Sequence, residues 1–227
     1  MTDRLTLRWP DPLPFASRDG RPIRILAVSD EPDPALESSV TRERAGPVDL
    51  IVGAGDLEPD YLCFVADAFH APLRYIRGNH DVGPAWSHTR REILPEPMSD
   101  GKVVEELGLR LVGFSGSPIY NERGMQVSAL GMWARVLGAT RAARRASPVL
   151  VVTHAPPRDV NDDTDLAHRG FTAFRWLAER LGPPLWLRGH TALVRRGIDD
   201  RTARHNGTLF YNCTGATLIE LLPPERR

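Results

Sequence analysis

Short runs of apolar residues recur along the chain, and most of them end at Gly, Pro, Asp or Asn. Runs that are rich in Val, Ile and Leu and are bounded by such turn residues are typical of β-strands. We therefore expect strands at residues 23–28, 48–52, 73–76, 103–114 with a break at Gly108, 149–153, 185–187, 208–212 and 217–221.

Longer segments carry apolar residues at three- and four-residue spacing, which is the pattern of an amphipathic helix. They cover residues 61–69, 128–145 and 171–181. Strands and helices alternate early in the chain and strands dominate later, so the pattern predicts a layered α/β fold with a mixed sheet. No repeat or linker divides the chain. We expect one domain over residues 20–222, preceded by a proline-containing leader at residues 1–19.

The composition is that of a globular protein, because 41% of the 227 residues are hydrophobic and 26% are charged. The 29 basic residues balance 29 acidic ones, and no block of like charge suggests nucleic-acid binding. No apolar run approaches the roughly 18 residues of a membrane span. Cys63 and Cys213 lack metal-ligand spacing, which favours free thiols and a cytoplasmic location. A monomer and a dimer are equally compatible with this composition.

Residue types that bind metals follow several predicted strands, at the point where each strand ends. The segments are 29–32 (Ser-Asp-Glu-Pro), 53–56 (Gly-Ala-Gly-Asp), 77–81 (Arg-Gly-Asn-His-Asp), 153–157 (Thr-His-Ala-Pro-Pro) and 188–191 (Arg-Gly-His-Thr). Taken alone, each Asp or His is more often a cap or turn residue. Ligands of open α/β sheets bind outside the carboxyl ends of the strands, so these side chains are expected to converge on one crevice.

In this order the segments resemble the motifs of the calcineurin-like metallophosphoesterase superfamily, which read D-x-H, GD, GNH[DE], H and GHxH. The resemblance implies a four-layered α/β/β/α sandwich of mixed sheets that holds two divalent metal ions. It further implies that Asp56 bridges the two ions. The second ion would be bound by Asp56, Asn79, His154 and His190, and this set is complete.

The first metal site departs from the family pattern. Asp30 is retained, but Pro32 and Ala192 stand where the family has histidines. Three interpretations remain open: the first ion is lost, it is bound weakly by the two aspartates with water and a nearby carboxylate such as Glu31 or Asp33, or the fold is kept without the reaction. Oxygen ligands favour manganese, with magnesium, zinc and iron as alternatives.

The resemblance also implies catalytic roles for His80 and Asp81. The histidine would stabilise or protonate the leaving oxygen, and Asp81 would orient its ring. The alternative is a turn in which Asn79 and Asp81 bond to the backbone. The implied activity is hydrolysis of a small phosphomonoester or phosphodiester by in-line attack of a metal-bound water. The alternative function is a non-catalytic scaffold or binding protein that keeps one metal site.

Other polar and aromatic residues are less informative. The acidic segment 162–170 is expected to cap the following helix, or else to place His168 or Arg169 at the rim of the site. Arg77 and Arg188 either reach a phosphate or form surface ion pairs. The three tryptophans within apolar patterns are expected in the core: Trp133, Trp176 and Trp186.

Overall fold

The computed structural model describes residues 3–86, 94–193 and 198–225. The strands are β1 Asp3–Arg8, β2 Ile23–Ser29, β3 Leu50–Gly53, β4 Leu73–Tyr75, β5 Val103–Glu106, β6 Leu109–Phe114, β7 Ser117–Pro118, β8 Gln126–Val127, β9 Leu150–Thr153, β10 Leu185–Arg188, β11 Thr202–His205, β12 Thr208–Asn212 and β13 Gly215–Leu222. The helices are α1 Leu13–Ala16, α2 Ser39–Ala45, α3 Pro59–Phe69, α5 Ala129–Arg145, α6 Thr172–Leu181 and α7 Ile198–Arg201, with short 3-10 turns η1 Pro34–Glu37 and η2 Pro84–Trp86.

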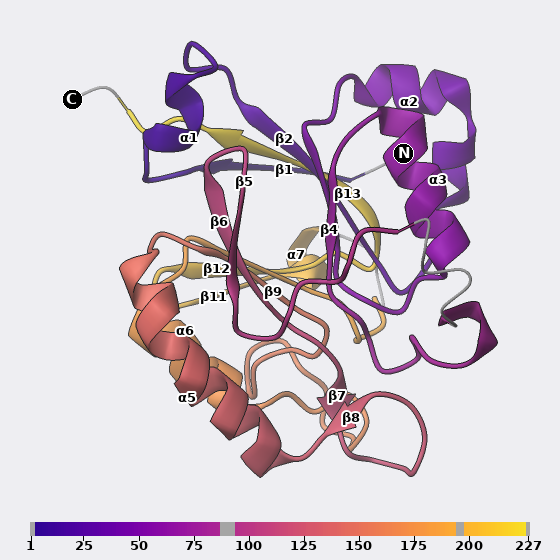
Figure 1. The fold of residues 1–227 in the computed structure, drawn as a ribbon, viewed down its shortest axis with the longest axis vertical. Helices are drawn as coiled ribbons and strands as arrows, with labels where there is room; N and C mark the ends of the chain where they lie inside the picture. Colours follow the sequence, from indigo (N-terminus) through magenta and orange to yellow (C-terminus); the bar gives the residue numbers. More distant parts are fainter. Residues whose placement is uncertain (1–2, 87–93, 194–197, 226–227) are drawn as a thin grey trace.

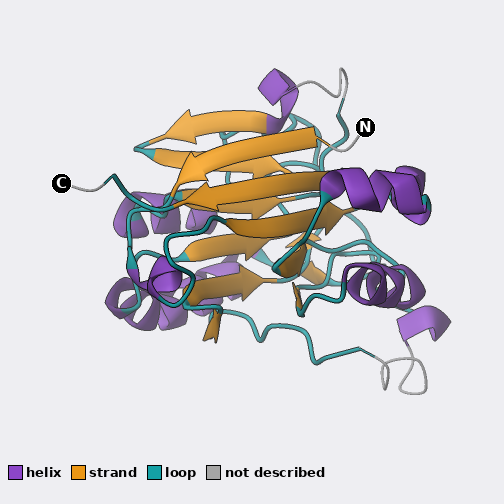
Figure 2. Ribbon diagram, turned by 90° about the horizontal axis from the view of Figure 1, so that it is seen from above, coloured by secondary structure: helices purple, strands orange, loops and turns teal. Residues whose placement is uncertain are grey.

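Two mixed sheets form the centre of the molecule. Sheet A has the strand order β1-β13-β2-β3-β4, and sheet B has the order β11-β12-β10-β9-β6-β5. Helices α2 and α3 lie on the outer side of sheet A, whereas α5 and α6 lie on the outer side of sheet B (Figures 1 and 2). The expected α/β/β/α sandwich is confirmed.

Alternation along each strand builds separate cores on the two faces of a sheet. In β2, Ile25 and Ala27 enter the core between the sheets, while Leu26 and Val28 pack beneath the helices of sheet A. In β10, Leu187 enters the central core, and Trp186 faces α6. Both faces of these strands are therefore buried, which explains why the sequence shows continuous apolar runs there.

The expectation of a leader at residues 1–19 is wrong for much of that segment. Strand β1 pairs in parallel with β13, and its Leu5 and Leu7 pack on the central core. Trp9 and Phe15 are only 1% and 2% exposed. The prolines delimit short elements here, and the alternating polar residues of β1 face away from the core. Burial of these apolar side chains holds the segment against the domain.

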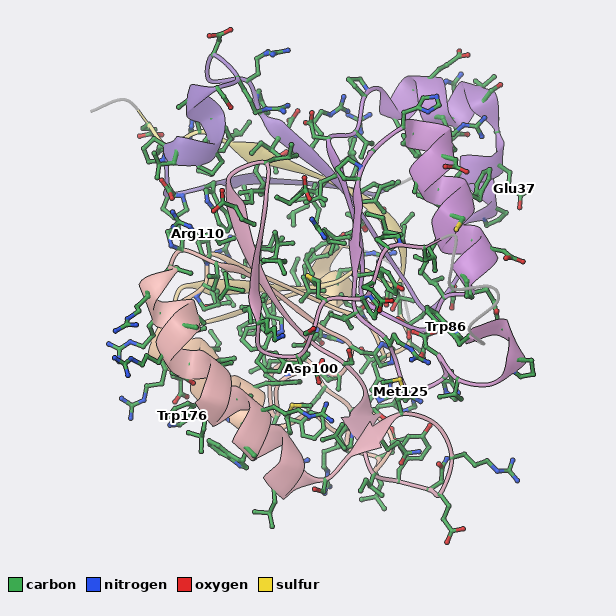
Figure 3. The ribbon with its side chains drawn as sticks, viewed as in Figure 1. Glu37, Trp86, Asp100, Arg110, Met125 and Trp176 are labelled. Atoms are coloured by element: carbon green, nitrogen blue, oxygen red, sulfur yellow. The ribbon has the colours of Figure 1, made fainter. Side chains whose placement is uncertain are left out.

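The three predicted helices begin and end close to the expected residues. Ser128 caps α5 by accepting a hydrogen bond from the N–H of Gly131 at 3.0 Å. Trp186 is fully buried. The rings of Trp133 and Trp176 pack edge to face between α5 and α6 with centroids 5.5 Å apart (Trp176 is labelled in Figure 3). Within the described residues, no helix is long and apolar enough to cross a membrane.

Candidate metal centre

The predicted metal-binding side chains come from the ends of strands in both sheets. Asp30, Asp56 and Asn79 follow β2, β3 and β4 of sheet A, whereas His154 and His190 follow β9 and β10 of sheet B. The strands of each group run parallel, so their carboxyl ends meet at one edge of each sheet. The sandwich brings the two edges together, and the side chains meet between them.

Three potential ligand atoms converge around one ring nitrogen of His154. The Nε2 atom of His154 lies 2.9 Å from Oδ1 of Asn79, 3.2 Å from Oδ2 of Asp56 and 3.1 Å from Nδ1 of His190. Asp56, His154 and His190 together form a group that has the geometry to hold a metal ion. This is the second-site set that the motifs imply, apart from Asn79, which joins it through the contact with His154.

Backbone carbonyls fix the outer nitrogens of both imidazoles. Nδ1 of His154 lies 2.9 Å from the oxygen of Ala54, and Nε2 of His190 lies 2.6 Å from the oxygen of Ala167. A ring N–H must point at each carbonyl, so each inner nitrogen presents a lone pair when its ring is neutral. Those lone pairs face each other and two further acceptor oxygens. Such a cluster requires a cation, and nitrogen and oxygen donors of this kind suit a divalent metal.

The protonation of the metal-free centre follows the same logic. Burial alone would lower the pKa of His154, but the carboxylate of Asp56 overrides this and raises the pKa to about 9. Burial and the nearby His154 lower the pKa of His190 to about 3. Burial also opposes ionisation of Asp56, yet His154 and the N–H of His80 keep its pKa below the usual range. One proton on His154 thus occupies the place of a cation at neutral pH.

Asp30, which the motifs assign to the first site, is engaged by protein donors. Its carboxylate accepts the N–H of His190, the hydroxyl of Ser29 at 2.5 Å and the hydroxyl of Thr214 at 3.4 Å. Burial raises the pKa of Asp30. Pro32 offers no ligand atom, so within the described residues the first site lacks imidazole donors. Asp30 instead supports the loop that carries His190.

The backbone at the site is held in unusual conformations. Asp30, Asp56 and His190 have φ values of 59°, 58° and 71°, in the left-handed region that non-glycine residues seldom adopt. The loops also approach closely: a Cβ at Gly78 would lie 2.0 Å from Oδ1 of Asp56. Glycine is required there. Tight turns of this kind aim the ligand side chains at the crevice.

His80 and Asp81 take different positions in the GNHD segment. The His80 side chain is exposed, and its backbone N–H donates to Oδ1 of Asp56 at 2.7 Å. Oδ2 of Asp81 accepts the N–H of Asp56 at 2.9 Å and that of Gly78 at 2.6 Å. Within the described residues Asp81 makes no hydrogen bond to the His80 ring. Its expected orienting role is therefore replaced by a structural one, and burial raises its pKa to about 6.

Tyr120, Ala167 and His168 also contact the site. No sequence pattern indicated a role for the first two. The hydroxyl of Tyr120 accepts a hydrogen bond from Nδ2 of Asn79 at 3.0 Å, which orients Oδ1 of that amide. The segment 162–170 supplies the Ala167 carbonyl and places the ring of His168 with its centroid 5.2 Å from that of His190. Nδ1 of His168 lies 3.0 Å from a carboxylate oxygen of Asp165. The rim position that was one of the two expectations for His168 is thus the observed one.

Both arginines next to motif glycines have structural roles. Arg188 is 1% exposed and donates to the carbonyls of Gly189 and Asn161 and to the hydroxyl of Thr191. Arg77 packs over the ring of Trp86 at 4.8 Å and donates to the carbonyl of Asp81. A surface ion pair was therefore the wrong expectation for Arg188, which fixes the loops around His190 from inside.

A sequence model of the family described as calcineurin-like phosphoesterase matches residues 24–193. The chain belongs to this family. The matched range, residues 24–193, contains all five motif segments. Members bind divalent metals, and the cluster of Asp56, His154 and His190 is the candidate for that site in this chain.

The solved structures that match are distant in sequence. One crystal structure is 13% identical, with a TM-score of 0.60 over 86% of this chain and 91% of that chain. A single mutant of Vps29 from Entamoeba histolytica is 14% identical, with a TM-score of 0.41, and wild-type Vps29 from the same organism in complex with zinc is 13% identical, with a TM-score of 0.39. Each Vps29 match covers 86% of this chain and 76% of that chain. Curated proteins give no match.

Proposed function

We propose that this calcineurin-like phosphoesterase is a metal-dependent hydrolase of small phosphomonoesters or phosphodiesters. The observation that carries the proposal is the cluster of inward-facing donors around Nε2 of His154. Outer hydrogen bonds to Ala54 and Ala167 hold both rings in the orientation that ligation needs. A site that only stabilised the fold would gain more from apolar side chains than from buried, mutually facing acceptors.

The chain's own residues have distinct tasks in this proposal. Asp56, Asn79, His154 and His190 would hold the ion, for which manganese is the proposed identity. A divalent ion bound there supplies Lewis acidity toward a phosphoryl oxygen and lowers the pKa of water. The oxygen of water adds to phosphorus, the ester P–O bond breaks, and the leaving oxygen takes a proton. His80 is the exposed imidazole next to this centre, and we assign it the transfer of that proton.

A second candidate function is a binding or scaffold protein that keeps one metal site without turnover. The engagement of Asp30 by Ser29, His190 and Thr214 favours it, because this carboxylate is not presented as a free ligand for a first ion. Pro32 and Ala192 add no donor. The exposed His80 favours the enzyme, since a scaffold has no use for an imidazole at this position.

The test is a hydrolysis assay on metal-free protein to which manganese is returned. The substrates are 4-nitrophenyl phosphate and bis-4-nitrophenyl phosphate, and the comparison is between wild type, His190→Ala and His205→Ala. His205 lies in β11 with its ring near Glu179, away from the centre. Manganese-dependent activity in wild type and His205→Ala but not in His190→Ala supports the enzyme. Tight manganese binding without hydrolysis of either ester selects the scaffold.

We also propose a cytoplasmic location. Cys63, which is half-buried, and Cys213, which is buried, are both free thiols. Free thiols persist in a reducing compartment, where disulfides are rare.

A further inference from the structure

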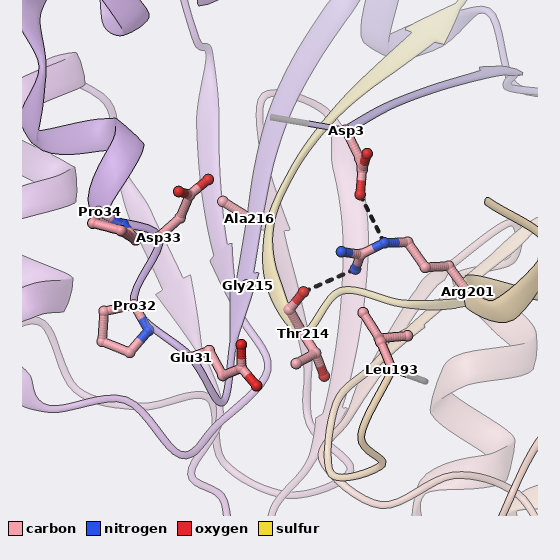
Figure 4. A pocket seen from close by; sticks show the side chains of 10 residues that line it. All are labelled: Asp3, Glu31, Pro32, Asp33, Pro34, Leu193, Arg201, Thr214, Gly215 and Ala216. Carbon is pink, nitrogen blue, oxygen red and sulfur yellow. Dashed lines mark hydrogen bonds and ion pairs between the residues drawn. The ribbon is translucent and has the colours of Figure 1, made fainter. Parts of the chain in front are cut away.

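A pocket of about 300 Å³ (Figure 4) lies at the edge of sheet A that carries Asp30, because the residues directly after Asp30 line it. The first strand β1 contributes Asp3, the start of β13 contributes Thr214 to Ala216, and the loop after β2 contributes residues 31–34. The Thr214 hydroxyl joins the pocket wall to Asp30 at 3.4 Å. The pocket therefore continues the crevice from the metal centre, and Pro32 lines it in place of the family's histidine.

One wall of the pocket is a buried guanidinium. Arg201 is 6% exposed, and its Nη1 donates to the carbonyls of Asn212 at 3.0 Å and Thr214 at 2.8 Å. Its Nε lies 2.8 Å from the carboxylate of Asp3, which balances the charge. Across the described part of the chain, Nη2 has no hydrogen-bond partner. The other contacts of Arg201 fix its guanidinium group, so Nη2 is a positioned hydrogen-bond donor for an acceptor that enters the pocket (Figure 4).

The opposite wall carries a rigid carboxylate. Oδ1 of Asp33 accepts the N–H of Ala35 at 2.9 Å, and in the described residues its second oxygen has no protein partner. Pro32 and Pro34 flank Asp33 and restrict the backbone on either side of it. Because the prolines restrain the loop before binding, the loop loses little conformational entropy when a cationic group binds to this carboxylate. Glu31 lines the same side and adds negative charge.

We propose that this pocket binds an amino-acid zwitterion, with its ammonium group on Asp33 and its carboxylate on Nη2 of Arg201. A zwitterion meets both walls at once, because its ammonium group pairs with the carboxylate of Asp33 and its carboxylate accepts from Nη2 of Arg201, the donor that Asp3 does not engage. A pocket of about 300 Å³ is at the small end of ligand sites and suits a group of this size. The assignment of a substrate to this pocket rests on the proposed function. If the protein hydrolyses phosphate esters, the substrate would be the phosphate ester of a hydroxy amino acid. O-phospho-L-serine is the simplest such ester.

The reaction is balanced with water alone. Water adds to phosphorus, the bond between phosphorus and the seryl oxygen breaks, and that oxygen takes a proton. The products are L-serine and inorganic phosphate. The pocket would hold the serine part while phosphate leaves from the metal side.

Binding of free L-serine tests the pocket without any turnover. Isothermal titration compares wild type with Asp33→Asn, which keeps the oxygen that caps Ala35 and removes the charge. Asp67→Asn, at an exposed carboxylate of α3, is the matched control. We expect L-serine to bind wild type and Asp67→Asn and to bind Asp33→Asn about tenfold or more weakly, the effect of losing a charged hydrogen bond. Absence of binding to wild type, or equal binding to Asp33→Asn, overturns the pocket assignment.

The substrate class is tested by kcat/KM for a series of esters with manganese. O-phospho-L-serine offers both charges, phosphoethanolamine only the ammonium, phosphoglycolate only the carboxylate, and 4-nitrophenyl phosphate neither. We expect phosphoserine to lead the series and its ratio to phosphoglycolate to fall in Asp33→Asn. Arg201→Lys should lower the ratio of phosphoserine to phosphoethanolamine.

The two proposals fail in different ways. Hydrolysis of the whole series without preference for phosphoserine overturns the substrate class and leaves the phosphoesterase intact. No hydrolysis of any ester removes the proposed function and with it the substrate role, while the L-serine titration still decides whether the pocket binds a zwitterion. If Arg201→Lys fails to fold because the side chain is buried, Asp33→Asn alone carries the decision.

Discussion

The backbone N–H of His190 donates to both carboxylate oxygens of Asp30, at 3.0 Å each. A residue that the family motif assigns to the first metal therefore positions His190, a candidate ligand of the second. Asp30 also accepts the hydroxyls of Ser29 and Thr214, both at Oδ2, so that oxygen is occupied by protein donors. The backbone contact links the residue that the motifs assign to the first metal site with the loop that carries His190.

Metal stoichiometry should reflect this asymmetry. We expect one equivalent of manganese to bind tightly to the metal-free protein, and a further equivalent to bind only at much higher concentration. His190→Ala should abolish the tight site, since it removes one of two imidazoles, whereas His205→Ala should retain it. Titration monitored by calorimetry, with elemental analysis of the washed protein, measures both. Two equal, tight sites would contradict the assignment.

Metal affinity should rise with pH. The metal-free protein holds a proton on His154, whose pKa is about 9, and the ion must displace that proton to reach Nε2. Below that pKa, affinity should increase about tenfold for each pH unit. Calorimetry at pH 7 in buffers of different ionisation enthalpy should report release of about one proton per ion. A flat pH profile between 7 and 9 would contradict the displacement of a proton from His154 by the ion.

Asp81 should matter more for folding than for metal. Asp81→Ala leaves the buried N–H groups of Asp56 and Gly78 without an acceptor and should cost about 1–3 kcal/mol of unfolding free energy. Asp81→Asn keeps an acceptor oxygen and should cost less. Chemical denaturation of the metal-free proteins near pH 7 compares them, and equal losses would argue against the hydrogen bonds as the cause.

The same residue gives a pH signature. Burial raises the pKa of Asp81 from 3.8 to about 6, so the folded protein holds a proton that the unfolded chain releases. This contribution to stability is complete below pH 3.8 and is lost as the pH rises to about 6. The slope of unfolding free energy over this interval should therefore be less negative in Asp81→Asn than in wild type.

His80→Ala should separate chemistry from binding. Its side chain is exposed and its backbone N–H, which any residue supplies, makes the bond to Asp56. Turnover should fall by ~10²–10⁴-fold, the usual contribution of a positioned acid, while manganese content stays constant. His70→Ala, at the end of α3, is the matched control. Undiminished turnover in His80→Ala would leave this residue with a turn role only.

Returning both family histidines tests whether the first site can be rebuilt. Positions 32 and 192 are exposed, so Pro32→His with Ala192→His should fold without overpacking. We expect a second equivalent of manganese to bind at least ~10-fold more tightly than in wild type, because even outer partners of a ligand have effects of that size. Ala192→His alone is the comparison. Unchanged affinity would mean that Asp30 does not exchange its protein donors for a metal.

Much of this centre could be predicted from the sequence, because buried strands appear as apolar runs and their ends as the Gly, Asp, Asn and His residues that follow. Continuous apolar runs located β2, β3, β9 and β10, and the polar residues after them had to lie at one edge. The missing parts are of two kinds. The Ala167 carbonyl acts through the backbone, which any residue would supply, so its identity carries no signal. Strand β1 packs on the core with one face only, so its apolar residues Leu5 and Leu7 alternate with polar ones. It therefore has no continuous apolar run by which it could be recognised.

The pairing of β1 with β13 sets the order in which the molecule can be completed during synthesis. Strand β13 lies between β1 and β2, yet it is made last among the described strands. Until residues 215–222 leave the ribosome, the edge of β2 stays open, and β1 has no neighbour on which to form a ladder. Contacts across such sequence separations form slowly, and an open apolar edge invites pairing with other chains. Nascent chains arrested before residue 215 are accordingly the form of this protein most in need of a chaperone.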